Sequence, residues 1–300
     1  MARKITMTAL AALCCAALGA GLVACEEPTE DGSQPSSAAS AAGTDKPAFS
    51  GTKKIRVEGR SVNVSCSGEA VAGRPVVVLM AGLGDSLAKM ADLQKTLSAK
   101  DRVCSFDRLG QGASDKPTGP QTVADSGKVL TGVLGQVAAD GPVVLAGHSL
   151  GGLLAARYAP DHQGKVKGLV LMDATSPTTN ADIAKVIPES ATGQGAELRA
   201  GTLAVNEGQN PEMLVNPDAE VRSAGDIPVE VIQHGVRYLG EVPTYGGGLE
   251  QVWSAGQKQW LGVSTGAGLS TAAKSGHEIY VDRADLAVKA IQRVTTQAAG

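Results

Sequence analysis

The chain has 300 residues, and its 43% hydrophobic content is ample for a sizeable folded core. Lys and Arg number 27 against 30 Asp and Glu, and the resulting formal charge of -3 disfavours a nucleic-acid partner. The 38 glycines follow no collagen-like period, which disfavours a fibrous protein. Five cysteines are an odd number, so in an exported protein at least one must have a fate other than pairing within the chain.

The N-terminus has the pattern of a bacterial export signal. Two cations come before a nearly uncharged run, residues 5–24, which is rich in Ala, Leu and Gly. A membrane-spanning helix is the alternative interpretation, and the many Ala and Gly residues make it a poor one. The run ends in Leu-Val-Ala-Cys, residues 22–25, which resembles the lipobox of bacterial lipoproteins. Residues 1–24 are therefore predicted to be removed and Cys25 to carry the lipid.

A polar stretch separates this signal from the rest of the chain. Residues 26–47 read EEPTEDGSQPSSAASAAGTDKP and include no large apolar side chain, so they cannot build a core. We interpret residues 25–49 as a lipid-anchored, flexible acidic linker and residues 50–300 as one folded domain. Together these features predict an exported protein, held by its N-terminal lipid at the outer face of the bacterial cytoplasmic membrane.

Short β-branched runs alternate with helical patterns from residue 53 onward. A hairpin and then buried strands are predicted at 54–57, 61–65, 75–80, 102–106, 142–146, 168–172 and 229–233. Helices are predicted at 86–99, 123–139, 152–159 and 286–296. Alternating strands and helices indicate an α/β fold with a mainly parallel, doubly wound sheet. In such a sheet the functional loops follow the carboxyl ends of the strands.

One motif carries a specific chemical prediction. Gly147-His148-Ser149-Leu150-Gly151 follows the strand pattern PVVLA and precedes the helical pattern LLAARYA. This is G-x-S-x-G in the strand–turn–helix context that a nucleophile elbow requires. The turn is so sharp that only small residues fit two positions before and after the serine, and Gly147 and Gly151 meet that need. A glycine-rich loop is the alternative interpretation, but the flanking patterns favour Ser149 as a nucleophile.

In four stretches the chain resembles the α/β-hydrolase family. Gly82-Leu83-Gly84 resembles the oxyanion loop, and residues 106–115, FDRLGQGASD, resemble the turn after the fourth strand. The elbow is the third stretch, and Ser275-Gly276-His277, before the last helix, is the fourth. The resemblance implies an eight-stranded, mainly parallel sheet with helices on both faces. It also implies that residues 174–228, too long for a simple crossover, form a small cap between strands 6 and 7.

A serine hydroxyl needs a base within hydrogen-bond reach and a carboxylate that orients the base. The resemblance places the base at His277, with His234 as a weaker alternative. Family members usually supply the acid just after the seventh strand, but there the first acidic residue of this chain is Glu241. Asp173 ends the sixth strand, a position that some family members use instead. We therefore predict Asp173 as the acid and keep Glu241 as the alternative.

The resemblance also indicates which groups stabilise the oxyanion that forms during acyl transfer. Backbone N–H groups of Leu83 and Leu150 are the predicted donors, each contributing roughly 3 kcal/mol to transition-state stabilisation. Ala81 stands where the family often has a histidine, which leaves the backbone donor intact. Asp107 and Arg108 are predicted to brace their turn and not to be catalytic.

The five cysteines divide by fate under this interpretation. Cys14 and Cys15 leave with the signal, and Cys25 is predicted to be acylated. In the fold that the chain resembles, the strands of Cys66 and Cys104 are neighbours. A Cys66–Cys104 disulfide is therefore plausible outside the membrane, the alternative being two buried thiols. Neither cysteine belongs to a metal-binding cluster.

The combined prediction is a serine hydrolase that cleaves an ester or related acyl bond of a small molecule. A covalent acyl-Ser149 would form and water would release it, with no cofactor and no metal. Two alternatives stay open. One is a cofactor-independent perhydrolase or haloperoxidase-type enzyme on the same triad, and the other is a non-catalytic surface lipoprotein that keeps the fold for binding. The sequence leaves the substrate and the oligomeric state open.

Overall fold

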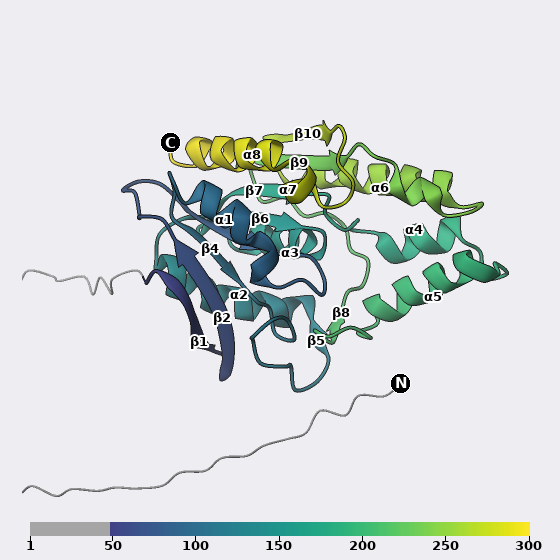
Figure 1. Ribbon diagram of the computed structural model, residues 1–300, viewed down its shortest axis with the longest axis horizontal. Coiled ribbons are helices and arrows are strands. Elements are labelled where there is room, and N and C mark those ends of the chain that lie inside the picture. The colour runs from purple at the N-terminus through teal and green to yellow at the C-terminus, as the bar shows by residue number, and fades with distance from the viewer. Residues whose placement is uncertain (1–48) are drawn as a thin grey trace, which may run out of the picture. The chain divides into compact units, whose positions relative to one another are not determined.

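The computed structural model describes residues 49–300, and an eight-stranded sheet is the centre of this part of the chain (Figure 1). The predicted export signal, the acylated Cys25 and nearly all of the predicted linker lie outside the described residues. Within residues 49–300, no helix combines the length and the apolar composition that crossing a bilayer requires.

The sheet is mainly parallel, as predicted. Its strands follow the order β1-β2-β4-β3-β6-β7-β9-β10, with β2 antiparallel to both of its neighbours and all later pairs parallel. A second, two-stranded sheet pairs β5 with β8. The strands are β1 (Gly51–Val57), β2 (Arg60–Ser67), β3 (Val76–Met80), β4 (Val103–Phe106), β5 (Gln121–Thr122), β6 (Val143–His148), β7 (Val166–Met172), β8 (Leu214–Val215), β9 (Val229–His234) and β10 (Ala267–Ala272).

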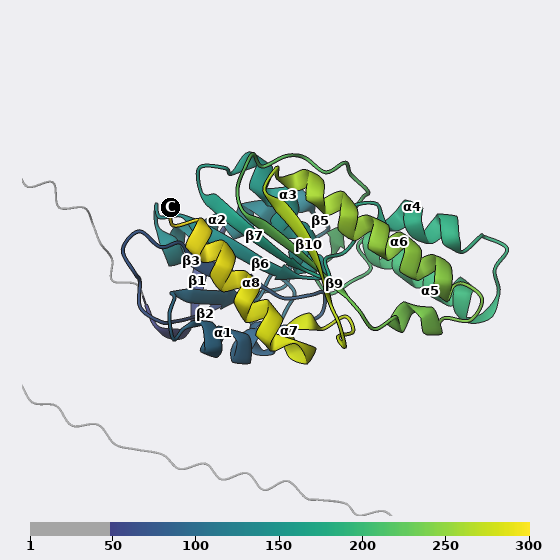
Figure 2. The same ribbon diagram turned by 90° about the horizontal axis from the view of Figure 1, so that it is seen from above.

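Helices cover both faces of the large sheet (Figure 2). Successive residues of a strand point to opposite faces, so Val78 and Met80 of β3 pack with α2 and α3, whereas Val77 and Leu79 pack with α1 and α8. This two-sided burial explains why the central strands are continuous apolar runs. The helices are α1 (Ala91–Leu97), α2 (Val123–Ala138), α3 (Leu150–Tyr158), α4 (Thr179–Val186), α5 (Gly193–Asn206), α6 (Gly246–Gln259), α7 (Ile279–Asp282) and α8 (Ala284–Gln297).

Two helices lie in the region predicted to form the cap, and a third joins them. Helices α4 and α5 fall between β7 and β9, while α6 falls between β9 and β10. Ile183 and Ile187 share a small hydrophobic cluster with Leu249 of α6. Figures 1 and 2 show the three helices together at one end of the sheet. Residues 174–228 are therefore only part of this layer, because α6 comes from a segment where no helix was expected.

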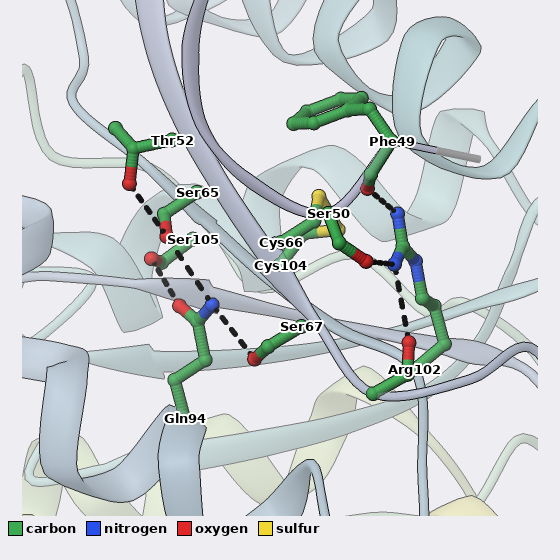
Figure 3. The surroundings of a disulfide bond; sticks show 11 residues. Phe49, Ser50, Thr52, Ser65, Cys66, Ser67, Gln94, Arg102, Cys104 and Ser105 are labelled. Carbon is green, nitrogen blue, oxygen red and sulfur yellow. Dashed lines mark hydrogen bonds between the residues drawn. A yellow bond between two sulfur atoms is a disulfide. The ribbon is translucent and has the colours of Figure 1, made fainter.

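A disulfide links two strands near the antiparallel edge of the sheet (Figure 3). Cys66 of β2 and Cys104 of β4 lie directly opposite each other, with their Cα atoms 4.1 Å apart. On one side, Gln94 of α1 donates to the Ser67 hydroxyl and accepts from the Ser105 hydroxyl. These contacts fasten α1 to both bridged strands.

Candidate active site

The elbow places Ser149 between β6 and α3 in a strained conformation. Its φ of 50° and ψ of -121° lie in a region that residues with a Cβ rarely adopt. A Cβ on Gly147 would lie 2.5 Å from backbone atoms of Gly151, and one on Gly151 would lie 2.3 Å from the Met80 carbonyl oxygen. Both glycines are therefore required on steric grounds, as the motif predicts.

The serine opens onto a cavity of about 450 Å³. Leu83 and Leu150, the two predicted oxyanion donors, line the same cavity, and α5 of the cap contributes another part of its wall. The Ser149 hydroxyl lies 3.5 Å from the hydroxyl of Thr175. Leu150 is the first residue of α3, where unpaired N–H groups and the helix dipole favour negative charge.

The oxyanion loop is held from behind by the turn that follows β4. The Gly82 carbonyl oxygen accepts from Arg108 at 3.0 Å and from Gln111 at 2.8 Å, and Arg108 also donates to the Ala81 carbonyl at 2.6 Å. In a trans peptide the C=O and the next N–H point in opposite directions. Fixing the Gly82 carbonyl therefore turns the Leu83 N–H away from these two side chains.

Arg108 is itself held by a carboxylate that sequence reasoning missed. Its Nε and Nη2 atoms each lie 2.8 Å from an oxygen of Glu212, which precedes β8. Both side chains are buried, and Gln111 donates to the same carboxylate at 2.8 Å. This bidentate pairing fixes the orientation of the Arg108 side chain. The turn after β4 is thus braced by Arg108, as predicted, and it also connects the oxyanion loop to the chain leading out of the cap.

The predicted base and acid are in contact. Nδ1 of His277 lies 2.7 Å from Oδ2 of Asp173, which follows β7 and is fully buried. Burial alone would raise the pKa of Asp173, but hydrogen bonds from His234 and His277 outweigh it and hold this pKa at about 2. The alternative acid, Glu241, is exposed in the turn Tyr238–Glu241. Within residues 49–300, no hydrogen bond joins Glu241 to His277.

Ser149 and His277 share no hydrogen bond in the described part of the chain. A contact of His148 instead connects His277 to the elbow. Nε2 of His148 lies 3.0 Å from the carbonyl oxygen of His277, and the two rings are 4.5 Å apart. Burial first, and then the neighbouring His277, lower the pKa of His148 to about 3, so it is a neutral imidazole that donates to this carbonyl. Before substrate binds, hydrogen bonds between catalytic groups are often long, and they shorten in the substrate complex.

Asp173 has further partners that no motif indicated. Trp253 of α6 donates its indole N–H to Oδ1 at 2.9 Å, and the backbone N–H of His234 donates to the same oxygen at 3.1 Å. Nδ1 of His234 lies 2.9 and 3.0 Å from the two carboxylate oxygens, and its Nε2 lies 2.9 Å from Oε2 of Glu250. Because β7 and β9 are sheet neighbours, a histidine ending β9 could have been placed near Asp173 from the strand order alone.

A larger cavity, of about 560 Å³, lies between α2, α3 and residues 215–222, and Ser149 is not part of its lining. Leu214 and Asn216 line the cavity at Ser149, whereas Val215 and Pro217 line the larger one. The extended chain at 214–217 therefore separates the two cavities, presenting alternate residues to each.

Comparison with known proteins agrees with this architecture. The family model described as alpha/beta hydrolase fold matches residues 75–217, which include the oxyanion loop, the elbow and Asp173. An enol-lactonase from Burkholderia xenovorans superposes with a TM-score of 0.56 at 20% identity, covering 81% of this chain and all of the other. At that level of identity the likeness concerns the fold.

Two curated relatives match shorter stretches. An uncharacterized protein of Schizosaccharomyces pombe is 40% identical over 91 residues, covering 30% of this chain and 17% of the relative. The protein of Caulobacter segnis named putative carbamate hydrolase RutD is 33% identical over 111 residues, covering 36% of this chain and 41% of the relative. The chain thus spans less than half the length of the curated relatives it matches.

Proposed function

We propose that this chain, which has the α/β-hydrolase fold and matches the family model over residues 75–217, is a serine hydrolase that cleaves an ester or related acyl bond of a small molecule. The observation that carries the proposal is the 2.7 Å contact between Asp173 and His277 at the strand ends where Ser149 stands on its elbow. The three residues follow the chain order Ser, Asp, His that is typical of the family.

The reaction would run in two halves. Ser149 Oγ attacks the acyl carbon while its proton passes to Nε2 of His277, and the resulting oxyanion accepts from the N–H groups of Leu83 and Leu150. Collapse expels the alcohol, which takes the proton from His277. Water then loses a proton to His277 and attacks the acyl carbon, and as the acid leaves, His277 returns that proton to Ser149 Oγ. Asp173 stays ionised throughout, orienting the imidazole and offsetting the charge it gains.

The cavity supports a modest, largely uncharged substrate. Its volume of about 450 Å³ lies at the small end of the range for drug-sized ligands. Leucine and valine side chains supply its apolar lining, while threonine and asparagine side chains supply hydrogen-bonding groups: Leu83, Leu150, Leu198, Val205, Leu214, Thr175, Thr179, Thr202, Asn206, Asn210 and Asn216. The only charged side chain in this lining is Glu197 of α5, which disfavours anionic substrates.

Hydrolysis of p-nitrophenyl acetate and butyrate by the full-length protein tests the proposal. We expect turnover that Ser149→Ala abolishes, with Ser223→Ala as the matched control because Ser223 is exposed and outside the cavity. A fluorophosphonate probe should label Ser149, as located by peptide mass spectrometry, and should not label the folded Ser149→Ala variant. Folded wild type that neither turns over these esters nor takes up the probe would contradict the proposal and favour a binding role.

We further propose that an N-terminal lipid on Cys25 anchors the hydrolase to the membrane surface. The support is the sequence of residues 22–25 and the polar stretch that follows it. Expression in a bacterial host should yield a membrane-associated protein whose N-terminal peptide carries the lipid mass. The Cys25→Ala variant should carry no lipid and should not associate with the membrane. A variant that still carries the lipid mass, or that stays on the membrane as wild type does, would overturn the assignment.

A further inference from the structure

We propose that His234 is a positioning residue for the catalytic acid: a buried cation, held between Asp173 and Glu250, that fixes Asp173 against His277 and limits the negative charge that His277 experiences. This proposal rests on the proposed function, since it concerns how the same acid–base pair works. Glu250 is the counterion that keeps the positive charge on His234.

The hydrogen-bond geometry fixes the protonation state of His234. Both ring nitrogens face carboxylates: Nδ1 is within 3.0 Å of both oxygens of Asp173, and Nε2 is 2.9 Å from Glu250. A carboxylate only accepts hydrogen bonds, and a neutral imidazole has a single N–H. Both contacts are satisfied together when His234 is an imidazolium. Burial lowers its pKa, but the hydrogen bonds and charges of Asp173 and Glu250 outweigh burial and raise it.

Few other ionisable groups face this cluster. Tyr238, from the turn after β9, packs edge-on against the His234 ring at 4.8 Å, and burial first, then the two carboxylates, raise its pKa far above the usual range. Tyr238 is therefore uncharged. From α6 come Glu250 and the neutral Trp253, and β10 presents Ala272 beside His234. Arg237 lines a surface pocket with His234 and Glu250, and Glu278, next to His277 in the chain, pairs with Lys89 at the surface. These three side chains, Arg237, Glu278 and Lys89, are exposed or half-exposed to solvent, so the buried charges near His277 are those of Asp173, His234 and Glu250.

Asp173, Glu250 and the His234 imidazolium together carry a net charge of -1, and this charge affects the protonation of His277. Without the imidazolium, two buried carboxylates would remain close to His277. Added negative charge favours the protonated form of a nearby imidazole. A protonated His277 cannot accept the Ser149 proton, so the enzyme would become active only at higher pH. His234 therefore keeps the base available at lower pH.

His234 also restricts where the carboxylate can point. Asp173 adopts a φ of 45°, which is uncommon for a residue with a Cβ, and it is held there by donors from two elements. The His234 ring and backbone N–H come from β9, and the Trp253 indole comes from α6. With these contacts in place, Oδ2 is directed to Nδ1 of His277.

A charge-balance experiment on the full-length protein tests the inference. His234→Gln removes the cation and should move the acid limb of the kcat/KM profile upward by about one pH unit, lowering kcat more than it raises KM. The double variant His234→Gln, Glu250→Gln restores the net charge of one negative, so its acid limb should return toward the wild-type position. His162→Gln, on a histidine that stacks on Tyr158 away from the site, is the matched control.

Two outcomes of that experiment would overturn the proposal. One is a wild-type pH profile in His234→Gln, whatever its kcat, because a merely structural role lowers activity without moving the profile. The other is a double variant whose acid limb coincides with that of His234→Gln.

Imidazole NMR of the unmodified protein gives a readout that needs neither a variant nor turnover. At pH 6.5, where an ordinary histidine is half protonated, His234 should be mainly an imidazolium, with two bound ring protons and the corresponding ¹⁵N shifts. A neutral ring at that pH would overturn the proposal even if the esterase activity is established, and an imidazolium would establish the charge on His234 even if Ser149 proves not to be a nucleophile.

Discussion

The elbow and the acid cluster reach the same edge of the sheet in opposite ways. The elbow, residues 147–152, is six consecutive residues whose shape is enforced by steric exclusion, since a Cβ on Gly147 or Gly151 would clash with backbone. The acid cluster, by which we mean Asp173, His234, Glu250, Trp253 and His277, is drawn from segments up to 104 residues apart and is held by hydrogen bonds. The shape of the elbow is thus set by steric clashes, and the arrangement of the acid cluster is set by hydrogen bonds.

This difference predicts different kinds of failure. A changed elbow has no alternative conformation, because the clashing atoms belong to the backbone and cannot rotate away. A changed acid cluster leaves the backbone intact and alters protonation and orientation. Elbow substitutions should therefore act mainly on folding, and acid-cluster substitutions mainly on catalysis.

The largest effect is expected at the elbow. Gly151→Val would place side-chain carbon 2.3 Å from the Met80 carbonyl oxygen, and we expect little or no folded protein, a loss exceeding about 4 kcal/mol. Gly135→Ala is the control, since Gly135 is exposed in α2 and an added Cβ meets no atom within 4 Å. That change should stabilise by about 1 kcal/mol in urea denaturation. A Gly151→Val protein as stable as wild type would contradict the claim that steric clashes enforce the shape of the elbow.

The second effect concerns the acid. Asp173→Asn should retain the fold and lower kcat roughly 10³- to 10⁴-fold, because an amide offers no charge to the protonated base. Glu241→Gln should remain within about twofold of wild type, since Glu241 is exposed and makes no hydrogen bond to a histidine in the described residues. Ester turnover by the two variants decides between the candidate acids, and the reverse ranking would assign the role to Glu241.

The third effect is a pH dependence of the free energy of unfolding. It comes from His148, an elbow residue that contacts His277 of the acid cluster. The pKa of His148 is about 3 when folded, below its value of 6.5 when unfolded, so the unfolded state binds more protons as the pH falls below 6.5. Stability should decrease by roughly 1 kcal/mol per pH unit between pH 6 and 4. Asp173, with a folded pKa of about 2 against 3.8, contributes only below pH 4.

Urea denaturation of His148→Asn and of wild type at several pH values isolates this contribution. The variant loses the hydrogen bond to the His277 carbonyl and should be less stable at neutral pH, but its stability should change less with pH in that window. Parallel slopes for the two proteins would show that His148 does not supply the pH dependence.

The smallest effect on the site is expected from the disulfide, which belongs to neither region. Cys66 and Cys104 are 38 residues apart, and closing a loop of that length contributes about 4 kcal/mol through the entropy of the unfolded chain. Cys66→Ala with Cys104→Ala should lower the free energy of unfolding by about that amount and leave kcat per folded molecule unchanged. Thiol alkylation of the denatured wild type before and after reduction checks the pairing, and alkylation of both thiols without reduction would contradict it.

Prediction from sequence succeeded where local pattern and local structure coincide. The buried strands β3, β4, β6 and β7 are largely buried on both faces, and the elbow motif lies between strand and helix as its residues indicate. Strand β9 was predicted at the right place, but it is not a continuous apolar run, because Glu230 and Gln233 are only partly buried. Strand β10, by contrast, reads AGLSTA and is largely exposed at the sheet edge, so its pattern is weak. Helix α6 begins with three glycines, which hides it from propensity reasoning.

The sequence by itself determined the fold class and the elbow, because those depend on periodicity and on steric limits that act within a few residues. The pairing of His277 with Asp173 instead of Glu241, the bracing of the Gly82 carbonyl by Arg108, and the His234 and Glu250 contacts were decided by the tertiary structure. Hydrogen bonds act over about 3 Å, and charges act over about 10 Å. Strand order and the packing of α6 decide which groups lie within these distances. Neither can be deduced from the spacing of the residues along the chain.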